Sequence, residues 1–316
     1  MTFIALDSED AQAGPAATSA PPPGEDAPLI HAVVGLGRFG TTHARKLASL
    51  SGFCLRATVD PAAAAGERAE LAGLPRLAAV DQLPPDIQSA TVATSDAAHA
   101  PVAQALMRRG CHVLVEKPLC IERRDGAHMI RTARQCGVTL SVGHIERFNP
   151  VFDDLTLARL RQTARTHRHS AHPFLRFRRY SSRDAGALDS VLDLMVHDLD
   201  LFAWLCAIPT DAPMQVLARR VGARHVRARV RLCDWVADLE SGYGSAPASA
   251  RLQAGHGGRQ LVLDLRSRVH PIPAADDALS RQYRDFRHAI HGRGRRIASG
   301  ADGLAAVARA CQILEA

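Results

Sequence analysis

The sequence predicts an α/β protein with two domains: a parallel, doubly wound sheet first, then an α+β domain with a predominantly antiparallel sheet. Three observations lead to this prediction. An apolar run is followed at once by a glycine-rich turn at residues 35–40. Strand-like and helical segments alternate up to residue 146, which indicates parallel strands joined by crossover helices. Beyond residue 206, strand-like runs at 215–221, 227–239, 249–255 and 261–266 are separated by short loops, which favours antiparallel pairing.

The glycine-rich turn predicts a phosphate-binding site. The run 29–34 has strand length, and the spacing of Ala44, Leu47 and Ala48 after the turn predicts a helix with a buried stripe. A strand, G-x-G-x-x-G and a helix together form the dinucleotide-binding turn of a Rossmann domain, because the helix N-terminus faces the pyrophosphate. The residues of the turn predicted to contact the dinucleotide are Gly35, Gly37, Arg38, Phe39 and Gly40.

Asp60 predicts which dinucleotide binds. It ends a second strand-like run, 53–59, twenty residues beyond Gly40. A carboxylate at this place accepts hydrogen bonds from the ribose hydroxyls of NAD and repels the 2′-phosphate of NADP. Pro61 and Ala62 follow, and neither is basic. We therefore predict NAD as the cofactor, with NADP less favoured.

The remaining alternation sets the domain boundaries. Further strand-like runs and the helical patterns between them lie at 90–94, 101–109, 111–115, 124–135 and 138–142. The Rossmann domain is therefore predicted over residues 28–146. Residues 147–316 are predicted to form a substrate-binding and oligomerisation domain, whose final helices pack back toward the first domain.

Residues 1–27 are predicted to form a disordered tail. They are rich in Ala and Pro, contain Ser and acidic residues, and show no apolar periodicity. They also lack the basic start and apolar core of a signal peptide.

Composition argues against several classes of protein. The net charge is +7, but the arginines are scattered and only three Tyr and two Trp are available for stacking, so we expect no nucleic-acid partner. The most apolar segment, 188–206, is interrupted by Asp and His, so we expect no membrane span. The seven cysteines form no C-x-x-C pair, and most are predicted to be buried, reduced thiols of a cytoplasmic protein. The histidine-rich run 167–172 has no accompanying carboxylate or cysteine, so we predict a solvated loop and no metal site.

Lys117 is the first candidate for chemistry. Lys and Arg together number 39, and only two of them are lysines. An ammonium differs from a guanidinium in size, donor geometry and the ease with which its pKa shifts, so a retained lysine is a candidate for a role that needs an amine. Lys117 follows the run 111–115 and so lies at the carboxyl end of a predicted parallel strand, where open α/β sheets bind ligands. Lys46, among polar neighbours, is interpreted as a solvated charge. That both lysines are compositional remnants remains open.

Asp193 and His197 are the second candidate. They are four residues apart on a predicted helix, so both point to one side. A carboxylate one turn from an imidazole can orient it and stabilise its protonated form, which supports a general base. An ordinary Asp/His pair on a helix surface explains the pattern equally well.

Together these segments resemble the family of nicotinamide-dependent sugar dehydrogenases that includes glucose–fructose oxidoreductase, inositol dehydrogenase and MocA. The resemblance covers residues 29–316. Its motifs are GLGRFG followed by HA, Asp60, ATS followed by His99, EKPL at 116–119, VGHIERFNP at 142–150 and DLMVHDLD at 193–200. Within the family, GHIERFNP combined with SVLDLMVHDLDL is most similar to members described as UDP-N-acetylglucosamine 3-dehydrogenases.

The resemblance implies an enzyme that oxidises a secondary hydroxyl of a sugar by hydride transfer to NAD. The most similar members imply that this sugar is a nucleotide sugar. The resemblance also implies His197 as the general base oriented by Asp193, with Lys117 stabilising alkoxide character on the same hydroxyl. Whether Lys117 or His197 takes the proton remains open. The further residues that the resemblance places at the cofactor are Thr94, Ser95, His99 and Glu116.

Two further predictions concern the second domain. Arg147 and Asn149 are expected at the junction of the domains, where substrate contact and a structural role are both compatible with the sequence. A homo-oligomer formed through the C-terminal sheet is also expected.

Two other functions remain open. One is a free-sugar or polyol dehydrogenase with the same residues, and the other is an NAD-binding regulator of a sugar pathway without turnover. A sensor has no need of the set Lys117, Asp193 and His197, and all three are present.

Overall fold

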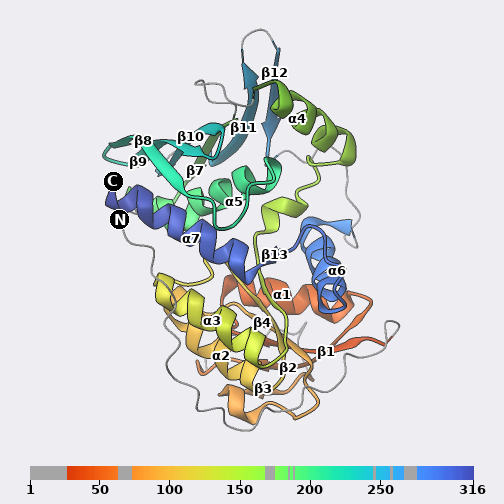
Figure 1. Ribbon diagram of the computed structural model, residues 1–316. Helices are drawn as coiled ribbons and strands as arrows, with labels where there is room; N and C mark the ends of the chain where they lie inside the picture. Colours follow the sequence, from red (N-terminus) through yellow and green to blue (C-terminus); the bar gives the residue numbers. More distant parts are fainter. Residues whose placement is uncertain are drawn as a thin grey trace.

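The computed structural model of the 316-residue chain describes residues 27–62, 73–167, 175–183, 186–187, 189–244, 247–256, 259–266 and 276–316. Two sheets form separate layers, one in the lower and one in the upper half of Figure 1. The predicted tail lies outside the described residues, except for Ala27. The α/β fold class, with a parallel and a mostly antiparallel sheet, is confirmed.

The first sheet has seven strands in the order β13-β6-β5-β4-β1-β2-β3, and all neighbours are parallel except β13 and β6. The bounds of its strands are β1 (Leu29–Val34), β2 (Phe53–Val59), β3 (Arg76–Leu77), β4 (Ser89–Val92), β5 (His112–Val115), β6 (Leu140–Val142) and β13 (Ala298–Ser299). The central strands β1, β4 and β5 are buried almost throughout because helices cover both faces of this sheet.

Alternate residues of β1 show how the two faces are covered. Ala32 and Val34 pack against α2 (His99–Arg108) and α3 (Arg123–Gln135). Val33 points to the opposite face, where α1 (Arg38–Ser49) and α6 (Ala278–Ile290) contribute apolar side chains. Because α6 comes from the last part of the sequence, the chain returns to its first domain near its end (Figure 1).

The second sheet has six strands in the order β12-β11-β7-β10-β9-β8, and only β7 and β10 are parallel neighbours. The bounds of its strands are β7 (Leu175–Ser181), β8 (Met214–Val221), β9 (His225–Leu232), β10 (Trp235–Tyr243), β11 (Ser249–His256) and β12 (Arg259–Asp264). The run 227–239, expected as one strand, is two antiparallel strands joined at Cys233–Asp234, where Cys233 has a φ of 50°. The strand β7 was not predicted, because its apolar alternation ends after Phe177, where the next inward position is the buried Arg179.

Helices cover one face of the second sheet. These are α4 (Asp154–His167), the π-helical segment η5 (Val191–Met195), α5 (Val196–Leu205) and α7 (Gly300–Glu315). They share one apolar core with the strands, which contains Leu160, Met195, Phe202 and Ile313. In α7, Val307 packs in the core of the first domain, whereas Ile313 packs in that of the second, so this helix joins the domains.

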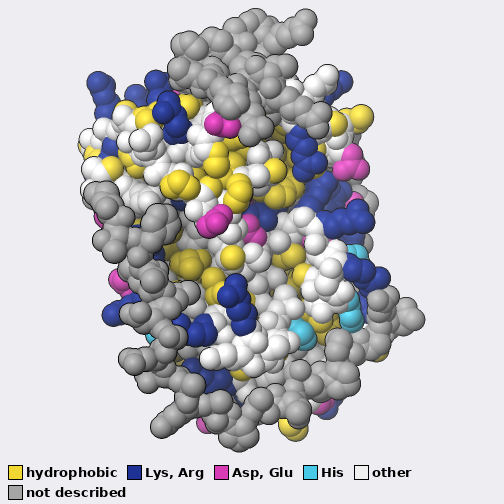
Figure 2. Space-filling model, in the orientation of Figure 1, with side chains coloured by type: hydrophobic (Ala, Val, Ile, Leu, Met, Phe, Trp, Pro, Cys, Tyr) yellow, Lys and Arg dark blue, Asp and Glu magenta, His cyan; other side chains and the backbone are white. Residues whose placement is uncertain are grey.

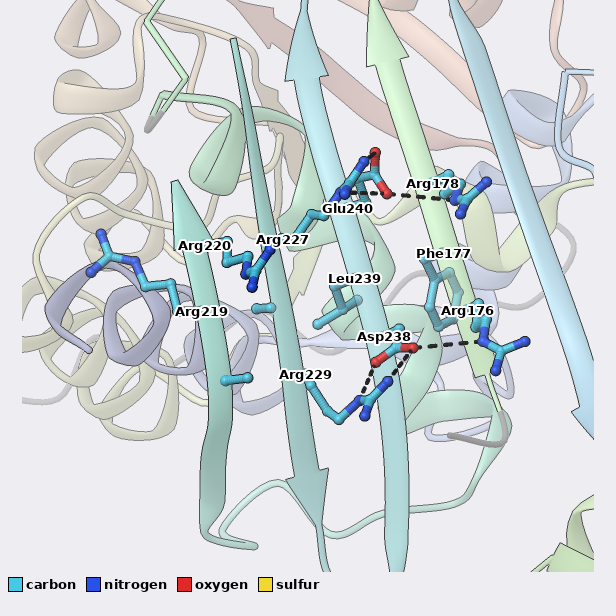
Figure 3. Close-up of a pocket in the computed structure, with 12 residues that line it drawn as sticks. Arg176, Phe177, Arg178, Arg219, Arg220, Arg227, Arg229, Asp238, Leu239 and Glu240 are labelled. Atoms are coloured by element: carbon cyan, nitrogen blue, oxygen red, sulfur yellow. Dashed lines mark hydrogen bonds and ion pairs between the residues drawn. The ribbon is translucent and has the colours of Figure 1, made fainter. Parts of the chain in front are cut away.

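The opposite face of the second sheet carries a ladder of charged side chains (Figure 3). Asp238 lies between Arg176 and Arg229, at 3.6 Å and 2.6 Å. On the face of the molecule shown in Figure 2, Lys and Arg side chains lie in several separate groups over both domains. None of the helices in the described ranges is long and apolar enough to cross a membrane. All seven cysteines are free, but only Cys111 and Cys120 are buried, fewer than expected.

Candidate active site

The glycine turn forms a cradle at the N-terminus of α1. Gly35 has a φ of 89°, and a Cβ there would lie 2.6 Å from the carbonyl oxygen of Ala93. A Cβ on Gly40 would collide with the carbonyl oxygen of Gly35, so this position requires glycine as well. Gly37 has nothing within 4 Å of its Cβ position, which leaves open space at the first turn of the helix. These features fit a dinucleotide pyrophosphate.

A cavity of about 660 Å³ opens beside this turn. Asp60 lies in its wall, where Oδ2 accepts a hydrogen bond of 2.6 Å from the amide of Leu36 and Oδ1 accepts one from Ala62. Asp60 therefore also fixes the backbone of the glycine turn. The cavity is lined by most of the predicted cofactor residues, namely Gly35, Gly37, Arg38, Phe39, Asp60, Thr94 and Ser95.

A second cavity of about 480 Å³ adjoins the first. The two share Phe39, Ala93 and Thr94, so they form one continuous cleft. The first domain contributes Asp96, His99, Glu116, Lys117, Pro118 and Ile121, and the second contributes Arg183, Asp189, Leu192, Asp193 and Tyr243. The second cavity therefore lies between the domains, next to the dinucleotide cradle.

Lys117 bridges the domains at this cavity. It follows β5, the peptide bond to Pro118 is cis, and its side chain is largely buried. Nζ donates one hydrogen bond of 2.8 Å to the main-chain oxygen of Asp193 and another of 2.9 Å to its Oδ1. An ammonium has three donors, so one is left for a ligand in the cavity.

Asp193 is the centre of a small charged network. Its Oδ2 accepts 2.7 Å and 3.2 Å hydrogen bonds from the hydroxyl of Tyr243 and from Nη1 of Arg183. Burial raises the pKa of this carboxyl, but Lys117, Tyr243 and Arg183 outweigh burial and hold it below its ordinary value. Burial and the neighbouring Asp193 raise the pKa of Tyr243, so its hydroxyl keeps its proton and donates.

The predicted orientation of His197 by Asp193 is wrong in this geometry. Asp193 hydrogen-bonds Lys117 instead, and the buried Nδ1 of His197 has no hydrogen-bond partner. The reason is local, because Val191–Met195 is π-helical and its wider turn removes the four-residue stacking of an α-helix. His197 is partly exposed, is not among the residues that line either cavity, and has its ring centroid 6.2 Å from that of His144. Burial, then Lys117, Arg179 and His144, hold the pKa of His197 well below its ordinary value, so the ring is neutral at pH 7.

Glu116 is positioned by a buried chain of hydrogen bonds. Its Oε1 lies 2.9 Å from Nε2 of His43, whose Nδ1 lies 2.7 Å from the hydroxyl of Tyr283. That hydroxyl lies 2.8 Å from Oγ1 of Thr91, which in turn contacts His31. Burial raises the pKa of Glu116, but the bond with His43 and the charges of His43 and Lys117 bring it below its ordinary value. Glu116 is thus a fixed carboxylate in the wall of the second cavity.

His99 lies at the boundary between cavity and protein interior. It is buried, and its Nδ1 lies 2.8 Å from the carbonyl oxygen of Pro118. A carbonyl only accepts, so Nδ1 carries the proton. His99 therefore holds the loop that bears Lys117.

Arg147 and Asn149 have structural partners. Arg147 forms a buried bidentate pair with Asp200, at 2.9 Å and 2.6 Å, and lies 3.4 Å from Asp302. The amide of Asn149 donates to Glu146 and to the main chain of Leu265. These partners account for the junction role of both residues.

No sequence pattern predicts that Tyr243, Arg183 or Tyr283 belongs to the site. Tyr243 ends a strand and Arg183 is one of many arginines, so neither carried a local signal. Tyr283 belongs to the carboxyl-terminal segment that the family resemblance covers, but the hydrogen bond to His43 depends on how α6 packs. The described residues contain no cluster of three metal-ligating side chains, and the histidine-rich run falls largely outside them.

Comparisons with known proteins agree with this geometry. The family model GFO_IDH_MocA, described as an oxidoreductase family with an NAD-binding Rossmann fold, matches residues 30–144. A UDP-N-acetylglucosamine 3-dehydrogenase of Acidithiobacillus ferrooxidans is 28% identical over 228 residues, which are 71% of this chain and 68% of that protein. The myo-inositol dehydrogenase Hyg17 of Streptomyces leeuwenhoekii is 33% identical over 183 residues, about half of each chain.

A structural comparison extends the similarity to both domains. The structure of UDP-N-acetylglucosamine 3-dehydrogenase GnnA from Acidithiobacillus ferrooxidans superimposes with a TM-score of 0.69 and 26% identity. The match covers 91% of this chain and 97% of that one. Residues 30–144 therefore belong to the GFO_IDH_MocA oxidoreductase family as its NAD-binding Rossmann domain, and the fold of both domains is similar to that of GnnA.

Proposed function

We propose that this protein oxidises a ring hydroxyl of a nucleotide sugar, converting UDP-N-acetylglucosamine to its 3-keto form with NAD as the acceptor. The observation that carries the proposal is Lys117, whose amine is fixed by Asp193 in the wall of the second cavity, which adjoins the dinucleotide cavity. An amine held there can polarise a hydroxyl that lies against the nicotinamide end of a dinucleotide.

The chain's side chains divide the remaining work. Bound NAD supplies the hydride acceptor. The third donor of Lys117 hydrogen-bonds the reacting oxygen and stabilises negative charge on it. His197, neutral at pH 7, takes the hydroxyl proton, and a positioned base of this kind contributes about 10²–10⁴-fold. Asp193 and Tyr243 keep the Lys117 amine in place.

The choice of substrate is supported by one relative and one structure. Both are named as UDP-N-acetylglucosamine 3-dehydrogenases, and the structure matches over both domains. The second candidate is a free sugar or polyol such as an inositol. It is supported by Hyg17, and by the carboxylates of Asp96 and Asp189 in the cavity wall, which suit hydroxyl donors.

A turnover assay tests the proposal. The purified protein is mixed with NAD and a panel of UDP-sugars, free sugars and inositols, and reduced cofactor is followed by absorbance. We expect turnover with UDP-N-acetylglucosamine, loss of turnover in Lys117→Met, and normal turnover in the control Lys46→Met, whose amine pairs with Asp277 away from the cavities. Turnover with inositols alone would support the second candidate, and binding of NAD without turnover on any member would favour a regulator.

We also propose a homo-oligomer formed through the outer face of the second sheet (Figure 3). Asp238 and Glu240 each lie between two arginines on this face, which reduces repulsion between like charges. Light scattering should give a mass above that of one chain, and Glu240→Arg should lower it. The seven free thiols support a reducing compartment such as the cytoplasm.

A further inference from the structure

The second cavity has few cations for its size. Among the described residues that line it, Lys117 and Arg183 are the basic ones, facing the carboxylates of Asp96, Glu116, Asp189 and Asp193. Glu116 hydrogen-bonds His43, and Asp193 binds Lys117. Any anionic group that entered this cavity would therefore meet strong repulsion everywhere except beside a guanidinium or an ammonium.

Arg183 lies in the wall that the second domain contributes to this cavity, as do Tyr243 and Asp189. Phe39 and Thr94, which line both cavities, come from the first domain. A substrate whose reacting hydroxyl lies at Lys117 can extend the rest of its body toward this wall, because Lys117 and Arg183 line the same cavity.

The Arg183 side chain is held in place yet accessible. Nη1 donates to Oδ2 of Asp193 at 3.2 Å, and the guanidinium carbon lies 5.9 Å from the ring centroid of Tyr243. The side chain is 61% exposed, so this contact does not enclose it. A guanidinium has five N–H donors, and the bond to Asp193 uses one of them. The remaining fork has the geometry that binds a phosphate in two places.

Lys117 and Arg183 are separated by one carboxylate. Lys117 binds Oδ1 of Asp193 and Arg183 binds Oδ2 of the same group. A pyranose ring with one hydroxyl at Lys117 can therefore bring a phosphate on its anomeric carbon to Arg183. The same carboxylate makes the two cations part of one network.

We propose that Arg183 is an anion subsite that binds the diphosphate of a nucleotide-linked sugar and selects it over the free sugar. This inference rests on the proposed function for its choice of sugar, but the anion subsite itself is a property of the cavity. In this arrangement Arg183 acts on binding, and Lys117 acts on the reacting hydroxyl.

The test separates anion binding from turnover. Binding of UDP and of inorganic pyrophosphate to the NADH-loaded protein is measured by calorimetry for wild type, Arg183→Gln, Arg183→Lys and the control Arg108→Gln. Arg108 is an exposed residue near the end of α2 whose side chain bonds Gln104. NADH affinity and melting temperature are measured for each variant, so that a misfolded protein is recognised.

We expect Arg183→Gln to weaken the binding of UDP and of pyrophosphate by about 10- to 100-fold. This is the factor expected for the loss of a hydrogen bond to a charged group. Arg183→Lys should recover part of this loss, and Arg108→Gln should bind as wild type. In Arg183→Gln the ratio of kcat/KM for UDP-N-acetylglucosamine to kcat/KM for the free sugar should fall by the same factor, because any effect that passes through Asp193 to Lys117 acts on both substrates alike.

Two outcomes overturn the inference: wild-type protein that binds neither UDP nor pyrophosphate, or Arg183→Gln that binds both as tightly as wild type. If UDP binding depends on Arg183 but no UDP-sugar is oxidised, the anion subsite stands and the proposed sugar is wrong. The two proposals therefore fail separately.

Discussion

Lys117 and Asp193, 76 residues apart in the chain, meet across the two domains, with Nζ 2.9 Å from Oδ1 and 2.8 Å from the main-chain oxygen of Asp193. One partner follows a strand of the parallel sheet, and the other lies in the π-helical turn of the second domain. The position of the amine therefore depends on both domains, and residues that hold Asp193 also hold Lys117.

Tyr243→Phe tests this dependence. The change removes the 2.7 Å hydrogen bond to Asp193 and keeps the buried ring, so the carboxylate loses one of its three partners. We expect kcat/KM for the sugar to fall by about 10-fold or more, the equivalent of a hydrogen bond to a charged group, with NAD affinity unchanged.

The matched control is Tyr180→Phe. This change also removes a hydrogen bond from a tyrosine to a carboxylate, that of Glu240, but on the outer face of the second sheet. Its turnover should equal that of wild type. Equal losses in both variants would show a general effect on stability and would contradict a role for Tyr243 at Lys117.

Asp60 makes a prediction about cofactor preference. Asp60→Ala removes a charged acceptor for the ribose hydroxyls and should cost about 1.5–3 kcal/mol of NAD affinity. Because Asp60 also binds the amide of Leu36, Asp60→Asn is the better test of charge alone, and it should narrow the gap between NAD and NADP. Direct titrations of both dinucleotides measure this, and a wild-type protein that prefers NADP would show that our interpretation of Asp60 is wrong.

His31 predicts how stability depends on pH. It is fully buried between Ser89 and Thr91, and burial followed by the charge of His43 lowers its pKa to about 3. An unfolded histidine has a pKa of about 6.5, so the unfolded state binds the extra proton between these values and stability falls as pH drops through that window.

The expected effect follows from this difference. Between pH 7 and pH 5, His31 alone should remove about 2 kcal/mol of the free energy of unfolding. Urea unfolding at the two pH values measures this loss of stability. In His31→Gln, the loss between pH 7 and pH 5 should be smaller by about 2 kcal/mol. An equal loss in the variant would mean that His31 is protonated in the folded protein.

The elements of the first domain could be predicted from sequence because their signals are local. The glycine turn, the apolar strands and the alternation with helices each depend on neighbouring residues, and the parallel sheet follows from that alternation. The second sheet was less predictable. The turn at Cys233–Asp234 lacks glycine and proline, so residues 227–239 resemble a single strand. The strand β7 has the buried Arg179 at an inward position, which interrupts its apolar alternation.

The candidate site shows the same limit. Lys117 was found by its rarity and its place after a strand. Its partner was misassigned because four-residue spacing assumes an α-helix, and the π-helical segment has no sequence signal that we recognised. Tyr243 and Arg183 reach the site only through the tertiary fold, so no pattern in the chain pointed to them.

The last prediction concerns Lys117 itself. Lys117→Arg keeps the charge but replaces a compact ammonium by a longer, planar group that stays protonated at working pH. Lys117 is 13% exposed and uses two donors on Asp193, so the larger group cannot keep both bonds and leave a third for the substrate. We expect turnover to fall by at least about 10²-fold, while NAD binding stays within a few-fold.

Combining this change with His197→Ala shows whether the two residues act on one hydroxyl. His197→Ala alone should lower turnover by a similar factor, because it removes the proposed proton acceptor. If Lys117 and His197 serve the same oxygen, the double variant should lose far less than the product of the two single losses. Losses that multiply would place them at separate steps. Near-normal turnover by Lys117→Arg on the substrate identified in the panel would remove Lys117 from the mechanism and leave it as a structural link between the domains.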